Sequence, residues 1–281
     1  MRKIALIGGD LRQISAARTL QSAGFMPFVF ANAPAAQAGF TAPYTLAETL
    51  DGADAVLLPV PSVKEKGLLH TPLSEITLPL AEFCRELRDK TTVFSWGGHL
   101  PIPHSRRVVN LAEDEVLLTE NARATAEIAL LQAISHAGRA IFDSKAAVLG
   151  YGRIGSVLCR HLSSLGCPVK VGARRENVRL EARKAGFSAF PLSDPALFSD
   201  VDLIFNTIPA SVVDAKSLVA LRRPACYLEL ASAPGGLSAD AKSHPLLGVV
   251  DGAGLPGRFC PESAGKFLAQ AVMCHLEAKG E

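Results

Sequence analysis

The sequence lacks any run of about 18 apolar residues, which is the length that a membrane-spanning helix requires. It also has no Cys-x-x-Cys pair, and its net charge of +2 at pH 7 is too small to indicate binding to nucleic acid or to a membrane surface. The first residues, MRKIALIGGD, have the pattern of a strand and not that of a signal peptide. We therefore expect a cytoplasmic protein without a metal site, whose six scattered cysteines are buried free thiols.

The composition is that of a globular protein, with 48% apolar and 20% charged residues, and a chain of 281 residues is long enough for two domains. Short apolar runs alternate with segments of helical period in both halves of the chain. This pattern predicts an α/β protein of two Rossmann-like, doubly wound domains, each with a parallel sheet covered on both faces, and a cleft between them. A last helix at 264–278 has no strand after it and is expected to cross back to the first domain.

The first domain is predicted over residues 1–120 and 262–281, a connecting helix over 121–140, and the second domain over 141–261. The first contains predicted strands at 4–7, 28–31, 55–61 and 92–95, predicted helices at 11–23 and 78–87, and ends at 116–118, before the helical pattern of 119–138. The second contains predicted strands at 146–149, 169–171, 203–206, 226–230 and 247–250, and predicted helices at 153–165 and 176–185.

The stretch AVLGYGRIG at 147–155 has the glycine spacing of a dinucleotide-binding turn, and it joins an apolar strand to an apolar-periodic helix. Gly150 permits the tight turn, Gly152 leaves room for a pyrophosphate against the backbone, and Gly155 lets the helix pack close to the strand. The pyrophosphate would lie over the first helical N–H groups, around Arg153 and Ile154. The stretch therefore predicts a Rossmann domain that binds a dinucleotide; the alternative is a Rossmann-like fold with an empty pocket.

Two arginines stand where dinucleotide folds that prefer NAD usually have an acidic residue. The segment VKVGARREN has Arg174 and Arg175 after the second strand of this domain, and no carboxylate there would repel a 2′-phosphate. Cations are unfavourable at a helix start, so the pair favours binding of a phosphate over a purely solvated role, which remains the alternative. The predicted cofactor is NADP.

Three further loops follow strands of the same domain and are expected at the ligand edge of its sheet. They are NTIPAS at 206–211, ELASAPGG at 229–236 and DGAGLPGRFCPESAG at 251–265. Any one could be a plain turn, but three in succession favour a cofactor site. The cofactor-binding residues predicted from them are Asn206, Thr207, Ile208, Pro209, Leu230, Ala231, Ser232, Gly254, Leu255 and Pro256.

The segments VLGYGRIG, VKVGAR, NTIPAS, LASAPGG and GLPGRFCPESAG, in this order, resemble the family of the dipicolinate synthase A subunit, and IGGDLRQ and TAE agree with it. The resemblance spans nearly the whole chain. It implies oxidation of dihydrodipicolinate to dipicolinate with NADP⁺ in the mother cell of a sporulating bacterium, together with the flavoprotein-like B subunit of dipicolinate synthase. The sequence departs from the family pattern at Glu229, where Asp is expected, at Ala233, where a basic residue is expected, and in NARATAE, which lacks a proline.

The two-domain plan also resembles that of D-2-hydroxyacid dehydrogenases. Those enzymes need an arginine soon after the fifth strand and a histidine near the C-terminal end, whereas ASAPGG has no arginine and GLPGRFCP has no histidine. This difference argues against 2-hydroxyacid chemistry. Two alternatives remain: an NADP-linked dehydrogenase of another small acid, and a non-catalytic nucleotide-binding regulatory subunit. A homo-oligomer is expected.

A small dicarboxylate substrate requires cations, hydroxyls or free N–H groups. The predicted substrate-binding residues are Asp10, Arg12, Ser95, Gly97, Gly98 and Asn121, which lie at predicted strand ends of the first domain and at the start of the connecting helix. The alternative for Asp10 is that it only caps the first helix. The predicted catalytic residues are His99 and Thr125; His99 has a suitable ordinary pKa but could equally be solvated or paired with a carboxylate. The sequence does not identify the general base.

Overall fold

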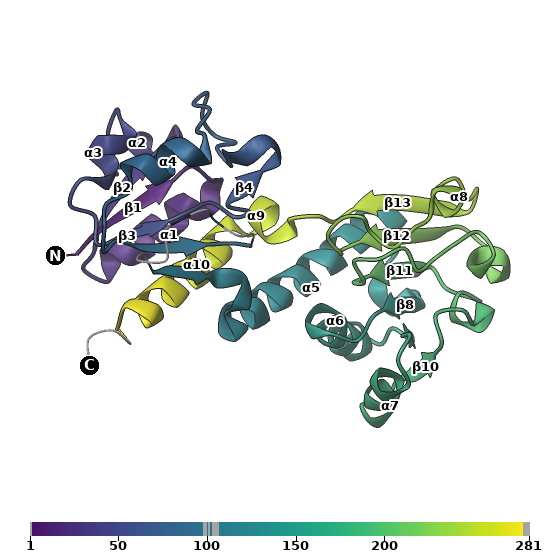
Figure 1. Cartoon of the computed structure of the whole chain (residues 1–281). Coiled ribbons are helices and arrows are strands. Elements are labelled where there is room, and N and C mark those ends of the chain that lie inside the picture. The colour runs from purple at the N-terminus through teal and green to yellow at the C-terminus, as the bar shows by residue number, and fades with distance from the viewer. Residues whose placement is uncertain (1, 98–99, 101, 103–106, 278–281) are drawn as a thin grey trace. The chain divides into compact units, whose positions relative to one another are not determined.

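The computed structural model describes residues 2–97, 100, 102 and 107–277. The chain divides into two compact units, one formed by Met1–Asn121 and Pro256–Glu281 and the other by Ala122–Leu255. Each unit contains a sheet in which every pair of neighbouring strands is parallel, with helices between the strands (Figure 1). The prediction of two α/β domains with parallel sheets is confirmed.

Within the described residues, the sheet of the first unit has five strands. In spatial order they are β2 (Met26–Phe30), β1 (Lys3–Ile7), β3 (Ala55–Leu57), β6 (Thr92–Ser95) and β7 (Val108–Asn110). The helices of this unit are α1 (Leu11–Ser22), α2 (Pro34–Gln37), α3 (Leu46–Leu50), α4 (Leu80–Glu86) and α10 (Pro261–Glu277), and a separate hairpin is formed by β4 (Val63–Lys64) and β5 (Leu68–Leu69).

Both faces of this sheet are buried, because side chains alternate along each strand. In β1, Ile4 and Leu6 pack in a cluster with apolar residues of α1 and α10. The intervening Ala5 and Ile7 pack in a second cluster with apolar residues of α3 and α4. The sheet is therefore covered on both faces, as a doubly wound fold requires.

The C-terminal helix α10 belongs to the first unit and packs closely against α1, as predicted. Gly265 lies at the crossing of the two helices. A Cβ added to it would lie 2.4 Å from the carbonyl oxygen of Arg12, 2.4 Å from the Cβ of Ser15 and 2.9 Å from the amide nitrogen of Ala16. The glycine in PESAG thus permits the close approach that joins the last helix to the first.

We predict that Gly265→Ala lowers the free energy of unfolding of the first unit by about 1–3 kcal/mol, the usual cost of overpacking a well-packed contact. The single tryptophan, Trp96, packs against the core that includes α1 and α10, so its fluorescence during urea unfolding reports on this unit. Gly248→Ala is the control, because the nearest atom to its added Cβ is 3.9 Å away. Equal urea midpoints for the two variants would contradict the prediction.

Helix α5 (Glu115–Ala137) covers most of the connecting helix predicted at 121–140, but it begins and ends earlier than expected, so residues 116–118 lie in its first turn and residues 138–140 lie outside it. The cause of the early start is local: the side chain of Asp114 accepts a hydrogen bond from the amide of Leu117 at 2.8 Å, which caps the helix. The other Asp114 oxygen lies 3.1 Å from Nε2 of His275 in α10. The boundary between the two units falls within this helix, after Asn121.

The sheet of the second unit has six strands. In spatial order they are β10 (Ser188–Phe190), β9 (Val169–Gly172), β8 (Ala146–Leu149), β11 (Leu203–Asn206), β12 (Ala225–Glu229) and β13 (Leu247–Asp251). Its helices are α6 (Arg153–Ser164), α7 (Glu176–Lys184) and α8 (Ala239–Lys242), and α9 (Leu255–Phe259) begins at its end. Numbered along the chain, the strand order is 3-2-1-4-5-6, the order of dinucleotide-binding folds, whose ligand crevice lies where the order reverses, here between β8 and β11.

None of the six cysteines forms a disulfide within the described residues. Cys159, Cys167 and Cys226 are buried, but Cys84 and Cys260 are half-buried and Cys274 is exposed, so the prediction that all six are buried is wrong for these last three. Burial raises the pKa of the Cys159 thiol to about 12 and that of Cys167 to about 11. These two thiols are therefore protonated at neutral pH and unreactive. Within the described ranges, no helix is both long and apolar enough to cross a membrane.

Candidate dinucleotide-binding site

A pocket of about 450 Å³ lies in the second unit at the carboxyl ends of β8, β9 and β11. This is the edge at which the reversal of strand order places a ligand. The pocket is lined by Gly150, Tyr151, Gly152, Arg153, Ile154, Ala173, Arg174, Arg175, Val178, Leu192, Thr207, Ile208, Pro209, Ala210 and Val212.

The three glycines of the turn have three different surroundings. Gly150 has a φ of +93°, and a Cβ added to it would lie 2.5 Å from Oγ1 of Thr207. A Cβ on Gly155 would lie 2.2 Å from the carbonyl oxygen of Gly150, so this glycine sets the approach of α6 to the strand. A Cβ on Gly152 would meet nothing within 4 Å. The turn therefore packs tightly at two glycines and opens into the pocket at the middle one.

The amino end of α6 faces this open space. Its N-cap residue is Gly152, which has no side chain to accept a hydrogen bond from the first turn. The first N–H groups of a helix carry a partial positive charge and bind anions when no side chain caps them. The open space at Gly152, next to a helix start that no side chain caps, fits the pyrophosphate of a dinucleotide.

Arg174 and Arg175 are exposed residues that follow β9 and line the pocket. The nearby Glu176 is paired with Arg179 and with Arg183, and hydrogen bonds from these two side chains lower the pKa of its carboxyl. In the described part of the chain no carboxylate forms an ion pair with Arg174 or Arg175. The two guanidinium groups are thus free to bind a phosphate at the end of the second strand of this fold.

The segment from Asn206 to Val212 supplies the opposite wall. Both the amide and the Oγ1 of Thr207 donate to the carbonyl oxygen of Leu149, at 2.9 and 2.8 Å, which ties this wall to β8. Asn206 is fully buried beneath the wall. A second pocket of about 540 Å³ shares Arg174, Leu192 and Val212 with the first and extends past Ser193 and Ser211. Because they share three lining residues, the two pockets adjoin at Arg174, and we call them together the cofactor depression.

The cofactor residues predicted from the last two loops do not line this pocket. Leu230, Ala231 and Leu255 are buried, whereas Ser232 and Gly254 are exposed. Pro256 is grouped with the first unit, because the segment from Pro256 onward packs there: a Cβ on Gly257 would lie 2.8 Å from both Cζ of Arg12 and Oδ2 of Asp10.

Some lining residues are not among those predicted from the sequence: Tyr151, Ala173, Val178, Leu192, Ala210 and Val212. Tyr151 stands within the glycine pattern, Ala173 directly precedes the arginines and Val178 lies in the first turn of the helix that follows them, so these three could have been inferred from position. Leu192 and Val212 come from loops without a recognisable pattern.

In the first unit, Asp10 is the N-cap of α1, since its Oδ1 accepts from the amide of Arg12 at 3.0 Å. Arg12 also donates to Asp10 through its guanidinium, at 2.8 Å, and to the carbonyl oxygen of Val60 at 2.6 Å. Asp10 thus caps α1, and both Asp10 and Arg12 already have protein partners. A role of either residue in substrate binding stays a prediction.

The remaining predicted residues lie on several elements. Ser95 ends β6, is 1% exposed, and its Oγ has no hydrogen-bond partner in the described structure. The amide of Gly97 donates to Oδ1 of Asn110 at 3.1 Å. Asn121 and the buried Thr125 lie one turn apart on α5. Gly98 and His99 lie outside the described residues.

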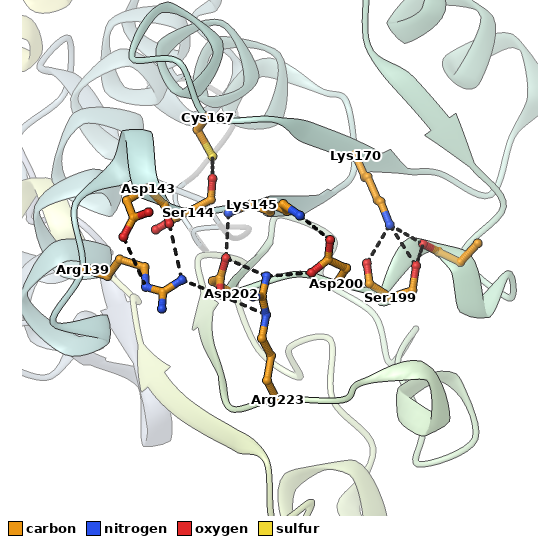
Figure 2. Close-up of polar contacts among 11 residues, drawn as sticks. Arg139, Asp143, Ser144, Lys145, Cys167, Lys170, Ser199, Asp200, Asp202 and Arg223 are labelled. Carbon is orange, nitrogen blue, oxygen red and sulfur yellow. Dashed lines mark hydrogen bonds and ion pairs between the residues drawn. The ribbon is translucent and has the colours of Figure 1, made fainter.

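A polar cluster at the opposite edge of the second sheet is a weaker candidate (Figure 2). Asp202 precedes β11, accepts from Arg139 at 3.1 Å and from the amide of Lys145 at 2.9 Å, and forms an ion pair with Arg223. The ammonium of Lys145 pairs with Asp200. Because each of these three cations has a carboxylate partner, the cluster offers no unpaired charge to a ligand and serves to join the starts of neighbouring strands.

Comparisons with known proteins show which proteins this chain is similar to. Residues 3–98 match the family model of the N-terminal domain of the dipicolinate synthase A subunit. The chain is 28% identical to the dipicolinate synthase A subunit of Bacillus subtilis (strain 168) over 282 residues, which cover 96% of this chain and 94% of that protein. The expected resemblance to this family is confirmed.

Solved structures give the same result. The dipicolinate synthase A subunit from Bacillus halodurans superposes with a TM-score of 0.84 at 29% identity, covering 98% of this chain and 97% of that one. The corresponding dipicolinate synthase chain from Bacillus subtilis superposes with a TM-score of 0.83 at 27% identity, covering 99% and 97%. A transhydrogenase from Sinorhizobium meliloti has a TM-score of 0.65 at 15% identity, covering 98% and 94%, which shows a shared fold alone.

Proposed function

We propose that this chain, which is similar to the dipicolinate synthase A subunit over nearly its whole length, is an NADP-dependent oxidoreductase that converts dihydrodipicolinate to dipicolinate during sporulation. The observation that supports NADP most directly is the pair Arg174 and Arg175. They line the pocket beside the uncapped start of α6, and the nearest carboxylate in the sequence, Glu176, is occupied by two other arginines.

We assign the pocket residues of the second unit to successive parts of a dinucleotide. The open space at Gly152 would take the pyrophosphate, and Arg174 with Arg175 would bind the 2′-phosphate of the adenosine ribose. The wall of Thr207, Ile208 and Pro209 follows the fourth strand of the fold, in the half that holds the second mononucleotide. This half would face the nicotinamide.

When bound, NADP⁺ supplies a hydride acceptor. Oxidation of the dihydropyridine ring to the aromatic ring removes one hydride and one proton, so each turnover gives one dipicolinate, one NADPH and one H⁺. The chain must hold the two carboxylates of the substrate and receive the proton. Our candidates remain Asp10, Arg12, Ser95, Gly97, Gly98 and Asn121 for binding, with Thr125 and His99 for catalysis.

We further propose that the chain acts in the cytoplasm, as a homo-oligomer and together with a flavoprotein-like partner, the B subunit of dipicolinate synthase. The support is its similarity to a protein that is named as one subunit of a synthase. Whether activity requires the partner distinguishes two cases. In the first, the chain is catalytic by itself; in the second, it binds the nucleotide while the partner performs the chemistry.

The test is an assay of the purified chain with NADP⁺ and dihydrodipicolinate, with and without the partner. We expect dipicolinate and NADPH to form in equal amounts. Thr125→Ala and His99→Ala should lower turnover while leaving NADPH affinity unchanged. If NADPH binds but no dipicolinate forms under either condition, the chain is a nucleotide-binding regulator or acts on another small acid.

A further inference from the structure

One carboxylate in the second unit organises several loops without lining the pocket itself. Glu229 ends β12 directly beside Asn206, the last residue of β11, with which it is in register. Its Oε1 accepts from Nδ2 of Asn206 at 2.6 Å and from the amide of Ala231 at 3.2 Å. Its Oε2 accepts from the amide of Gly236 at 2.6 Å and from the hydroxyl of Tyr227 at 3.2 Å.

The four donors are held in place by close packing. Asn206 and Tyr227 are fully buried, and burial raises the pKa of the Tyr227 phenol, which therefore remains a donor at neutral pH. A Cβ added to Gly236 would lie 2.4 Å from Nδ2 of Asn206 and 2.5 Å from the hydroxyl of Tyr227. No side chain other than hydrogen fits at this position, so the amide of Gly236 can reach the carboxylate.

Both ends of the pocket wall depend on these contacts. At the first end, the side chain of Asn206 accepts from the amide of Ile208 at 3.1 Å and donates to its carbonyl oxygen at 2.9 Å. At the second end, the carbonyl oxygen of Gly236 accepts from the amides of Val212 and Val213, at 2.8 and 2.9 Å. The segment between these ends contributes Thr207, Ile208, Pro209, Ala210 and Val212 to the pocket lining.

We infer that Glu229 is the positioning residue of the cofactor site: its carboxylate holds loop 207–213 at both ends and so fixes the wall against which the nicotinamide half of the dinucleotide lies. This inference rests on the proposed function. Glu229 acts through Asn206 and Gly236 and needs no contact with the ligand. Arg174 and Arg175 follow β9, outside loop 207–213, and none of the four hydrogen bonds of Glu229 reaches them. Residues 211–213 of the loop line the second pocket beside Arg174, but the contacts expected for the 2′-phosphate are the two guanidinium groups, which this carboxylate does not hold.

Replacement of Glu229 should therefore affect the nicotinamide half of the site and leave binding at the adenosine half unchanged. Glu229→Gln keeps the size of the side chain but offers one acceptor oxygen to four donors. Glu229→Asp is one methylene shorter, so it keeps the bond to its register partner Asn206 and withdraws from Gly236. Misplacement of a reacting group by about 1 Å costs on the order of 100-fold in rate. We expect turnover to fall roughly 10–100-fold in Glu229→Gln and roughly 3–10-fold in Glu229→Asp.

The decisive measurement uses two probes. The first is 2′,5′-ADP, which carries the 2′-phosphate but no nicotinamide; its Kd should stay within about threefold of the unmodified value in both variants, a change of less than about 0.7 kcal/mol. The second is NADPH, whose nicotinamide fluorescence on binding should be weaker and less polarised in both variants, most so in Glu229→Gln. Glu86→Gln, at an exposed residue that ends α4 in the first unit, is the control and should leave both probes and turnover unchanged.

The outcomes separate the inference from the function it rests on. If the unmodified protein binds neither probe, the proposed function fails. If the unmodified protein binds both and the Glu229 variants match it in NADPH fluorescence and turnover, or lose 2′,5′-ADP affinity along with turnover, the positioning role is wrong. Should Glu229→Gln fail to fold, Glu229→Asp decides by the same comparison.

Discussion

Replacing Arg174 and Arg175 together with alanine is expected to abolish most of the preference for NADPH over NADH. Each charge-assisted hydrogen bond to a phosphate contributes about 1.5–3 kcal/mol, so the pair together contributes at most about 3–6 kcal/mol. Because both arginines are exposed, we expect the lower end of that range, a loss of NADPH affinity of roughly 100-fold. NADH, which has no 2′-phosphate, should bind the double variant as it binds the unmodified protein.

The control is Arg222→Ala, an exposed arginine of the same unit that lines neither part of the cofactor depression. It should leave both affinities unchanged, which excludes a general effect of lost positive charge. Salt provides a second check, since added salt screens exposed phosphate contacts. The difference in affinity between NADPH and NADH should decrease as the salt concentration rises in the unmodified protein, but not in the double variant. A double variant that still prefers NADPH as strongly as the unmodified protein would place the 2′-phosphate elsewhere.

Gly152→Ala is expected to weaken binding of both NADPH and NADH without destabilising the fold. Its φ of −89° is allowed for alanine, and the added Cβ meets no protein atom within 4 Å. The Cβ would instead enter the space in which the pyrophosphate contacts the backbone. A steric cost of about 1–3 kcal/mol corresponds to a roughly 5–150-fold loss of affinity.

Gly155→Ala is the matched comparison within the same turn. Its Cβ would lie 2.2 Å from the carbonyl oxygen of Gly150, so this variant should lower the free energy of unfolding of the second unit. Calorimetric titration and urea unfolding of the two variants separate the effects. Unchanged NADPH affinity in Gly152→Ala would mean that the pyrophosphate does not lie over this turn.

The features that the sequence predicts well are those whose causes are local. The strand, glycine turn and helix at 146–164 follow from apolar runs, the φ of Gly150 and the periodicity of α6. The sequence predicts the bounds of the parallel strands β6, β8 and β11 correctly, because each is a short, fully buried run. The division of the chain into two α/β units follows from the alternation of strands and helices along the sequence.

The features that were missed depend on tertiary contacts or on very short segments. Strands β7 and β10 have three residues each and no strong alternation, so they appear only through pairing with β6 and β9. The early start of α5 follows from the cap at Asp114, a signal that the sequence did contain. The role of Glu229 could not be predicted, because Asn206 comes from another strand and the loop that ends at Gly236 must fold back onto the carboxylate, so the donors meet only in the folded unit.

The most direct test of the account is a calorimetric titration of the unmodified protein with NADPH and with NADH at the same salt concentration. The account predicts one site per chain and an affinity for NADPH at least about 100-fold higher than for NADH, about 2.7 kcal/mol in binding free energy. Equal affinities for the two cofactors, or binding of neither, would contradict it.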